Sequence, residues 1–139
     1  MLKFLSETEI GPEFLKLMGK DKRFAVAFWG NGALTSLGLD GRGAKGAKII
    51  CNLESGATNP DVVKQLIQSG AVVRSNPKLH AKVYASSSTI ILGSSNASAN
   101  GLVVEGKNEL TGWIEANIMT DDPTLVGKVG KWFNTPVSL

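Results

Sequence analysis

The chain is poor in the residues that most often carry metal and redox chemistry: it has one cysteine and one histidine among 139 residues. A lone cysteine cannot form a disulfide within the chain. Cys51, inside the apolar stretch KIICNL, is predicted to be a small buried side chain. One histidine and one cysteine also cannot supply the ligands of a zinc site within a single chain. We therefore expect no metal, no cofactor and a reducing, cytoplasmic environment.

Long apolar runs and blocks of like charge are missing as well. No apolar stretch approaches the roughly 18 residues needed to span a bilayer. The opening MLKFLSETEI does not have the pattern of a signal peptide, so we expect no membrane partner. The formal net charge of +3 is compatible with a nucleic-acid partner, although no long basic block occurs. Length and composition indicate a single globular domain, 1–139.

Short apolar runs that alternate with helical stripes predict an α/β protein. Buried strands are expected at 23–30, 47–53, 71–75, 80–85, 89–94 and 109–116. Helices are expected at 7–18, 59–70 and 122–133, with a short one at the start of 31–46. Asp121 and Asp122 precede Pro123, which indicates a helix start rather than a metal-binding pair. This order of elements predicts an α/β/α sandwich around a mixed central sheet.

The glycine-rich stretch GRGAKG at 41–46 matches the pattern G-x-G-x-x-G. A dinucleotide-binding loop must follow a strand and open a helix, whereas a predicted strand follows this stretch. We therefore interpret it as a flexible surface loop. Arg42 and Lys45 are its candidate contacts to a phosphate backbone.

The stretch KLHAKVYASSSTIILGSSNASANGL, residues 78–102, contains the only histidine. On a strand, residues two apart share a face, so His80 and Lys82 should point the same way, as should Ser94 and Asn96. If the two strands pair as a hairpin around the serines, these four polar groups converge at one end of the pair. The alternative interpretation is a structural histidine followed by ordinary polar turns.

The motif His80-x-Lys82 followed by Gly93-Ser94-x-Asn96 resembles the signature of the phospholipase D superfamily. That signature is H-x-K, an aspartate further on, and then G-S-x-N. The resemblance implies a phospholipase D-like α/β fold. It also implies a phosphodiesterase in which His80 is the nucleophile.

The specific resemblance extends over residues 78–112 and includes two departures. Glu109, in KNELTGW, matches the acidic residue that small nucleases of this superfamily carry after the motif. The motif aspartate would fall near Ser87, which cannot replace its charge. The gap before Gly93 is also one residue shorter than the commonest form.

The chemistry of phosphodiester cleavage agrees with what the resemblance implies. Neutral imidazole can attack phosphorus to form a covalent intermediate. Lys82 supplies positive charge to the phosphate, and Ser94 and Asn96 supply hydrogen-bond donors. A carboxylate such as Glu109 can accept the other imidazole N–H and so fix the tautomer. No metal is required.

A single histidine cannot be both the occupied nucleophile and the proton donor to the leaving oxygen. Larger members of the superfamily carry two copies of the motif, and this chain carries one. We therefore expect a homodimer with the active site at its two-fold interface, acting on nucleic acid, DNA in preference to RNA. Lys78 would add positive charge over that site. The alternatives are a phospholipid hydrolase or transferase, and a binding module that grips phosphate without cutting.

Overall fold

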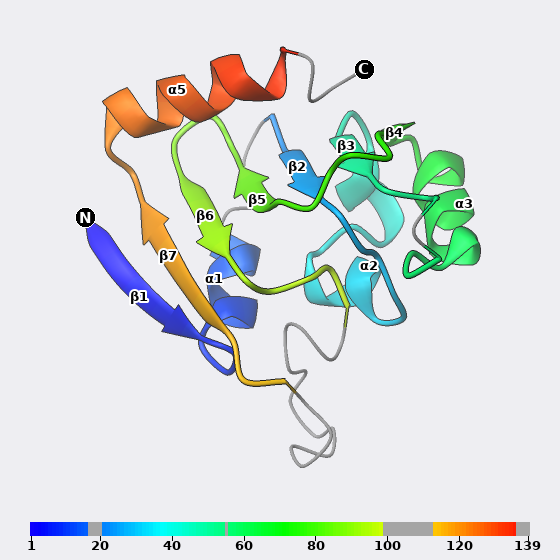
Figure 1. The fold of residues 1–139 in the computed structure, drawn as a ribbon, viewed down its shortest axis with the longest axis horizontal. Helices are drawn as coiled ribbons and strands as arrows, with labels where there is room; N and C mark the ends of the chain where they lie inside the picture. Colours follow the sequence, from blue (N-terminus) through cyan, green and yellow to red (C-terminus); the bar gives the residue numbers. More distant parts are fainter. Residues whose placement is uncertain (17–20, 55, 99–112, 136–139) are drawn as a thin grey trace.

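The computed structural model of the chain describes residues 1–16, 21–54, 56–98 and 113–135. Within these residues, seven strands form one sheet in the order β1-β7-β6-β5-β2-β3-β4 (Figure 1). The strands are β1 (Leu2–Ser6), β2 (Arg23–Val26), β3 (Lys48–Cys51), β4 (Val72–Ser75), β5 (Lys82–Ala85), β6 (Ile90–Gly93) and β7 (Ala116–Thr120). β2, β3 and β4 run parallel, and the remaining neighbours are antiparallel. The sheet is therefore mixed, as predicted.

Helices cover both faces of this sheet. They are α1 (Ile10–Lys16), α2 (Ala33–Ser36), α3 (Pro60–Gln68) and α5 (Pro123–Phe133), with a 3-10 helix η1 (Gly41–Ala44). The first three pack on one face, where apolar residues such as Phe14 and Leu66 meet Tyr84 and Ile91 of the sheet. On the other face Phe133 of α5 packs over β2 and β3. The predicted α/β/α sandwich is confirmed.

The two longer helices begin where the sequence predicted, and the described side chains give the reason. The Asn59 side chain accepts a hydrogen bond from the Asp61 N–H at 2.9 Å, directly before Pro60. The Asp122 side chain, directly before Pro123, accepts a hydrogen bond from the Leu125 N–H at 3.1 Å. A capping side chain before a proline satisfies amide groups that the first turn leaves unpaired.

The strand predicted at 109–116 is wrong in its position. Residues 113–115 precede the strand, which begins at Ala116, and residues 109–112 lie outside the described part of the chain. The buried polar side chain of Asn117 interrupts the apolar alternation that would have identified β7. β1 was not predicted, because Leu2 and Phe4 face outward on an edge strand and leave no buried stripe.

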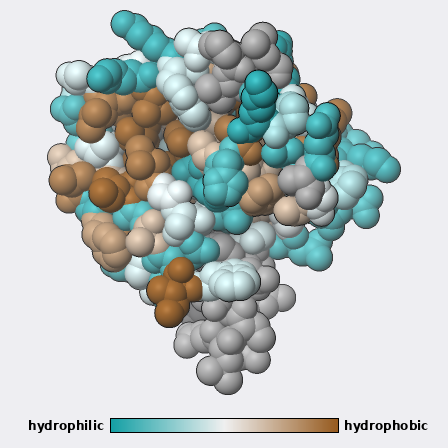
Figure 2. Space-filling view, viewed as in Figure 1, coloured by the Kyte–Doolittle hydropathy of each residue, from teal (hydrophilic) through white to brown (hydrophobic). Residues whose placement is uncertain are grey.

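The face of the sheet that carries α5 is only partly covered. Phe4 pairs in register with Ile118, which pairs with Leu92, and all three side chains remain exposed, as does Leu2. Figure 2 shows apolar side chains gathered on this face, below α5. Across the described residues, no helix is both long enough and apolar enough to cross a bilayer.

Candidate active site

His80 and Lys82 lie at the end of the sheet where β2 ends and β5 begins. Lys82 is the first residue of β5 and pairs with Val26, the last residue of β2. His80 is exposed and precedes the strand, which therefore starts two residues later than predicted. The Lys82 ammonium nitrogen (Nζ) lies 3.3 Å from Nε2 of His80 and donates to the His80 carbonyl oxygen at 2.9 Å. The two side chains thus meet directly.

The contact of Lys82 is with Nε2 of the imidazole. An ammonium group can only donate hydrogen bonds, so the tautomer that carries its proton on Nδ1 would present the Nε2 lone pair to Lys82. In that tautomer Nε2 is the nitrogen that can attack an electrophile.

Phe28 supports both groups and was not singled out from the sequence. Its ring meets the His80 ring edge-on, with centroids 5.9 Å apart, and the Lys82 Nζ lies 5.6 Å from its centroid. Such contacts between an aromatic ring, an imidazole and a cation restrict how the polar side chains can turn. The sequence signal that could have identified Phe28 was its position, two residues after the end of the buried strand β2.

Ser94 and Asn96 follow β6 and return to the same end of the sheet. β5 and β6 pair antiparallel, so the hairpin expected from the sequence is present. The Ala97 N–H donates to the Phe28 carbonyl at 3.1 Å, and the Gly30 N–H donates to the Ala97 carbonyl at 2.8 Å. These bonds hold the segment that carries Asn96 beside the segment that carries Phe28. Among described residues, the buried Oδ1 of Asn96 has no hydrogen-bond partner.

The carboxylate that the structure brings to this end is Glu115, which immediately precedes β7. The Ser94 hydroxyl donates to the Glu115 carboxylate, and the Ala116 N–H donates to the Ser94 hydroxyl at 3.0 Å. Glu109, the acidic residue selected from the sequence, lies outside the described residues. Placing the strand too early made Glu115 look like a residue within the strand. Because the strand begins at Ala116, Glu115 is the acidic residue that immediately precedes it.

Lys82 and Glu115 interact electrostatically. Burial lowers the pKa of the Lys82 ammonium group, and the Glu115 carboxylate partly offsets this by raising it. Burial also raises the pKa of the Tyr84 hydroxyl well above its usual value, and Glu115 adds to that shift. A single carboxylate therefore acts on two β5 side chains that share one face of the sheet, Lys82 and Tyr84.

Beneath the polar groups, a buried hydrogen-bond network fixes the segment after β6. The Tyr84 hydroxyl donates to the Ser95 carbonyl at 2.9 Å. The Asn117 amide donates to the Ser95 hydroxyl at 2.9 Å and to the Leu5 carbonyl at 3.4 Å, and its oxygen accepts from the Ser95 N–H at 3.3 Å. Buried polar groups that are fully paired make a rigid support, so the loop carrying Ser94 and Asn96 has a defined shape.

Ser87, where the superfamily motif would have aspartate, lies in the turn between β5 and β6. That turn is at the far end of the hairpin from His80, because β5 leads away from His80 and β6 returns. Within the turn, the Ser86 hydroxyl accepts from the N–H groups of Ser88 and Thr89 at 3.3 and 3.2 Å. The absence of a carboxylate at 87 therefore removes no group from the end that carries His80.

The three weaker candidates are divided between the two ends of the sheet. Lys78 is exposed two residues before His80, in a turn where its N–H donates to the Asn76 side chain. Arg42 and Lys45 line hollows where β2 and β3 begin, which is the opposite end. The stretch 41–46 is not a purely irregular loop, because η1 places Ala44 in the core.

No cluster of three or more His, Cys, Asp or Glu side chains suited to a metal ion occurs among the residues that the structure describes. The groups at this end of the sheet are an imidazole, an ammonium, a hydroxyl, a carboxamide and a carboxylate. That set offers one nucleophile together with donors and positive charge for an anion.

Comparison with solved structures identifies the fold. Nuc from Salmonella typhimurium, a phospholipase D family member, superimposes with a TM-score of 0.72 at 15% identity, over 96% of this chain and 91% of Nuc. NucT from Helicobacter pylori gives 0.65 at 17% identity, over 96% and 92%. The phosphatidylserine synthase of Haemophilus influenzae Rd KW20 gives 0.69 at 13% identity, over 98% of this chain and 36% of that protein. By sequence, no family model and no curated protein matches the chain. The chain has the fold of the phospholipase D superfamily.

Proposed function

We propose that the chain is a phosphodiesterase of the phospholipase D superfamily that needs no metal and cleaves nucleic acid as an endonuclease. The observation that carries this proposal is the 3.3 Å contact between Lys82 Nζ and His80 Nε2. The nitrogen that we propose as nucleophile and the cation that we propose to bind phosphate are thereby adjacent at one end of the sheet. Phosphodiester cleavage requires both.

In the first step, Nε2 of His80 attacks phosphorus, the new P–N bond forms, and the P–O bond to the leaving oxygen breaks. Lys82 moves from the imidazole to the non-bridging oxygens as the phosphate binds. Asn96 supplies a further hydrogen bond to the same oxygens, and Ser94 supplies another once its hydroxyl turns from the Glu115 carboxylate. In the second step, water attacks the phosphohistidine, the P–N bond breaks and the imidazole is released.

The leaving oxygen needs a proton in the first step, and the attacking water must lose one in the second. We propose that the imidazole of a second chain donates a proton to the leaving oxygen in the first step and accepts one from the attacking water in the second. Two His80 side chains would then form one site. Trp113 and Ile114, directly before Glu115, support an interface here because they are 68% and 92% exposed. Large apolar side chains exposed beside a site are typical of surfaces that a partner covers.

The carboxylate that orients His80 is either Glu115 or Glu109. Glu115 is favoured by its contact with Ser94 and by its effect on the pKa of Lys82. A carboxylate that accepts the Nδ1–H of a neutral imidazole would stabilise the positive charge that develops as Nε2 attacks.

Nucleic acid is preferred over phospholipid as the substrate. The formal net charge of +3 suits a polyanion, and the neighbours Nuc and NucT match over nine-tenths of their own length. The structural match to the phosphatidylserine synthase supports the second candidate, a phospholipid hydrolase or transferase. A binding module without catalysis is the third candidate, motivated by serine in place of the motif aspartate.

Cleavage of a labelled DNA oligonucleotide in EDTA tests the proposal, together with hydrolysis of the small diester bis(p-nitrophenyl) phosphate. We expect both reactions to proceed in EDTA, and quenching during turnover with denaturant at alkaline pH, where a P–N bond to histidine survives, to retain substrate phosphate on His80. Activity that disappears in EDTA and returns with magnesium would contradict the mechanism. Turnover of phosphatidylcholine vesicles without DNA cleavage would favour the lipid alternative. Binding of DNA without hydrolysis of either substrate would favour the binding module.

A further inference from the structure

At the end of the sheet opposite His80, where β2 and β3 begin, three adjoining hollows are lined by basic side chains. Their volumes are about 230, 220 and 170 Å³. Lys22 lines the first two, and Lys48 lines the first and the third, so the hollows form one continuous surface. We call this surface the basic end; its basic residues are Lys22, Arg23, Arg42, Lys45, Lys48 and Arg74.

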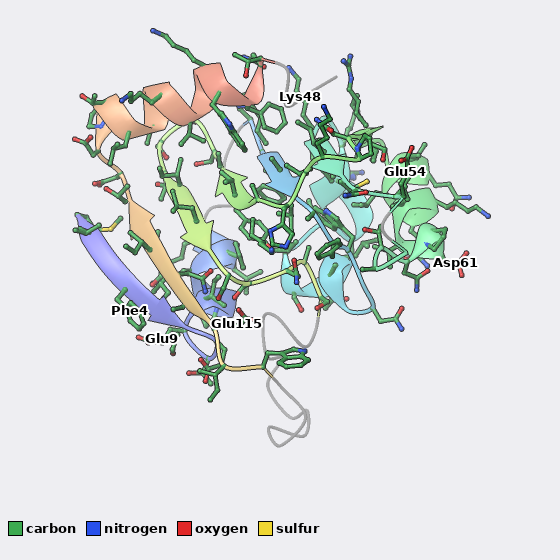
Figure 3. The ribbon with its side chains drawn as sticks, in the orientation of Figure 1. Phe4, Glu9, Lys48, Glu54, Asp61 and Glu115 are labelled. Atoms are coloured by element: carbon green, nitrogen blue, oxygen red, sulfur yellow. The ribbon has the colours of Figure 1, made fainter. Side chains whose placement is uncertain are left out.

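The position of the basic end separates it from the candidate active site. Arg23 and Lys48 are the first residues of β2 and β3, whereas Lys82 pairs with Val26, the last residue of β2. Figure 3 labels Lys48 and Glu115, which lie at opposite ends of the sheet. The basic end cannot therefore contact the phosphate that reacts at His80.

Charge is concentrated strongly at this surface. Six of the 15 basic residues line the hollows, and Asp21 is the one acidic residue that does so among those described. The rest of the chain then holds nine basic and eleven acidic residues and is slightly negative. The net charge of +3 is thus the sum of a strongly basic surface and an acidic remainder.

The hydrogen bonds of the loop hold its two cations in place. Lys22 Nζ donates to the Gly43 carbonyl at 2.8 Å, and the Gly46 N–H donates to the Gly70 carbonyl at 3.1 Å. Ala44, between Arg42 and Lys45, is fully buried in the core. These contacts fix the backbone on both sides of the two cations.

Several cations of the basic end lack a counter-charge. Arg42, Lys45 and Lys48 form no ion pair with any described residue. The Nε of Arg23 is buried and has no hydrogen-bond partner among the described residues. Burial lowers the pKa of the Lys22 ammonium group. Unpaired buried donors and uncompensated positive charge are both relieved by a bound anion.

We infer that the basic end is a second binding surface for the phosphate backbone of nucleic acid, separate from the site at His80. The hollows adjoin one another across β2, β3, β4 and η1, and their six basic residues are spread over all three. Cations spread over several adjoining hollows suit a repeating polyanion better than a single small ligand. The choice of nucleic acid as ligand rests on the proposed function, whereas the presence of an anion-binding surface does not.

Such a surface would hold a segment of nucleic acid other than the one being cut. Phosphate contacts of this kind add affinity without sequence preference, and each contact makes binding more sensitive to salt. The basic end would then raise the local concentration of substrate and leave the chemical step unchanged.

The test compares two triple variants that remove the same charge. Arg42→Gln/Lys45→Gln/Lys48→Gln alters the basic end, and Lys3→Gln/Lys16→Gln/Lys64→Gln removes three exposed lysines elsewhere. Binding of a fluorescein-labelled DNA duplex is followed by anisotropy over a series of NaCl concentrations. Hydrolysis of bis(p-nitrophenyl) phosphate is measured in parallel, and thermal unfolding checks that each variant is folded.

We expect the basic-end variant to weaken duplex binding and to reduce the slope of log K against log salt by about 2 to 3, close to 0.9 for each lost phosphate contact. The control variant should keep the wild-type slope, and all three proteins should hydrolyse the small diester at the same rate. Equal losses in both variants would overturn the inference, because only net charge would then matter. Binding of tripolyphosphate, a small polyanion, is measured as well. If the basic-end variant lost tripolyphosphate binding but retained duplex binding, the surface would bind a small anion rather than nucleic acid, and the inference would be overturned. Failure to hydrolyse the small diester would count against the proposed function alone.

Discussion

Gly93 lies directly against Asn117 across the β6–β7 pair. A Cβ atom at position 93 would lie 2.5 Å from the Asn117 Oδ1 and 2.6 Å from its Cα. The same Asn117 side chain holds Ser95 by two hydrogen bonds. The glycine of the motif therefore permits the close approach on which the loop carrying Ser94 and Asn96 depends.

Gly93→Ala should destabilise the protein and disturb this loop, because backbone atoms cannot move aside as a flexible side chain can. We expect a loss of about 1–3 kcal/mol in the free energy of unfolding, typical of overpacking, measured by urea denaturation. Gly127→Ala is the matched control, since a Cβ there meets nothing within 4 Å. It should be neutral or stabilise α5 by up to about 1 kcal/mol. Equal effects of the two substitutions would show that the approach at Gly93 is not tight.

His80→Ala should abolish cleavage of both DNA and the small diester, since in the proposed mechanism it removes the nucleophile and the proton donor together. Lys82→Ala and Asn96→Ala should each lower kcat by about 10²–10³-fold, the usual loss for one group that binds developing negative charge. Lys64→Ala, on the exposed side of α3, is the control and should retain full activity. Substantial activity in His80→Ala would mean that the histidine is structural.

The pH dependence of activity should report the pairing of Lys82 with Glu115. Lys82 acts as an ammonium group, so activity falls as pH rises through its pKa, which burial holds below the usual lysine value. Glu115 raises that pKa, so Glu115→Gln should move the alkaline limb of the kcat profile to lower pH. Glu109→Gln makes the same change in net charge and should move the limb less. A larger shift for Glu109→Gln would assign the pairing to Glu109 instead.

The shared site can be tested by mixing subunits. His80→Ala chains added in excess to wild type, with time to exchange, should suppress activity because each heterodimer holds a single imidazole. Activity that follows the number of wild-type chains alone would refute the shared site. A fully active monomer by sedimentation at the assay concentration would refute it equally.

Cys51 should resist thiol reagents in the native protein. Its side chain is fully buried, and burial raises its pKa from about 9 to about 11, so the thiolate is scarce at pH 8. We expect negligible reaction with Ellman's reagent under native conditions and one thiol per chain in guanidinium chloride. Rapid native labelling would mean that β3 opens easily in the native protein.

Local signals in the sequence were sufficient to predict most of the fold. Caps and prolines predicted the starts of α3 and α5, and continuous apolar runs predicted β2, β3 and β6. The hairpin formed by β5 and β6 followed from two such runs around a serine turn. These features depend on neighbours within the chain, so pattern and propensity were informative.

The elements that sequence missed depend on distant partners. β1 is an edge strand whose Leu2 and Phe4 are exposed, and it is ordered by pairing with β7. Asn117 is buried because Ser95 and Leu5 bind it, and this polar residue concealed the start of β7. The contact of Phe28 with His80 also required two segments more than 50 residues apart to meet. No local pattern encodes such contacts.

The pairing of β1 with β7 also determines the order in which the protein can fold during synthesis. β1 is made before the other described strands, yet its one neighbour in the sheet is β7, which is made after all of them. The loop that carries Ser94 and Asn96 likewise waits for Ala116 and Asn117 to bind it. A ribosome-bound chain stopped before residue 115 would therefore already contain His80 and Lys82 but should cleave nothing, because the support for the loop that carries Ser94 and Asn96 has not yet been made.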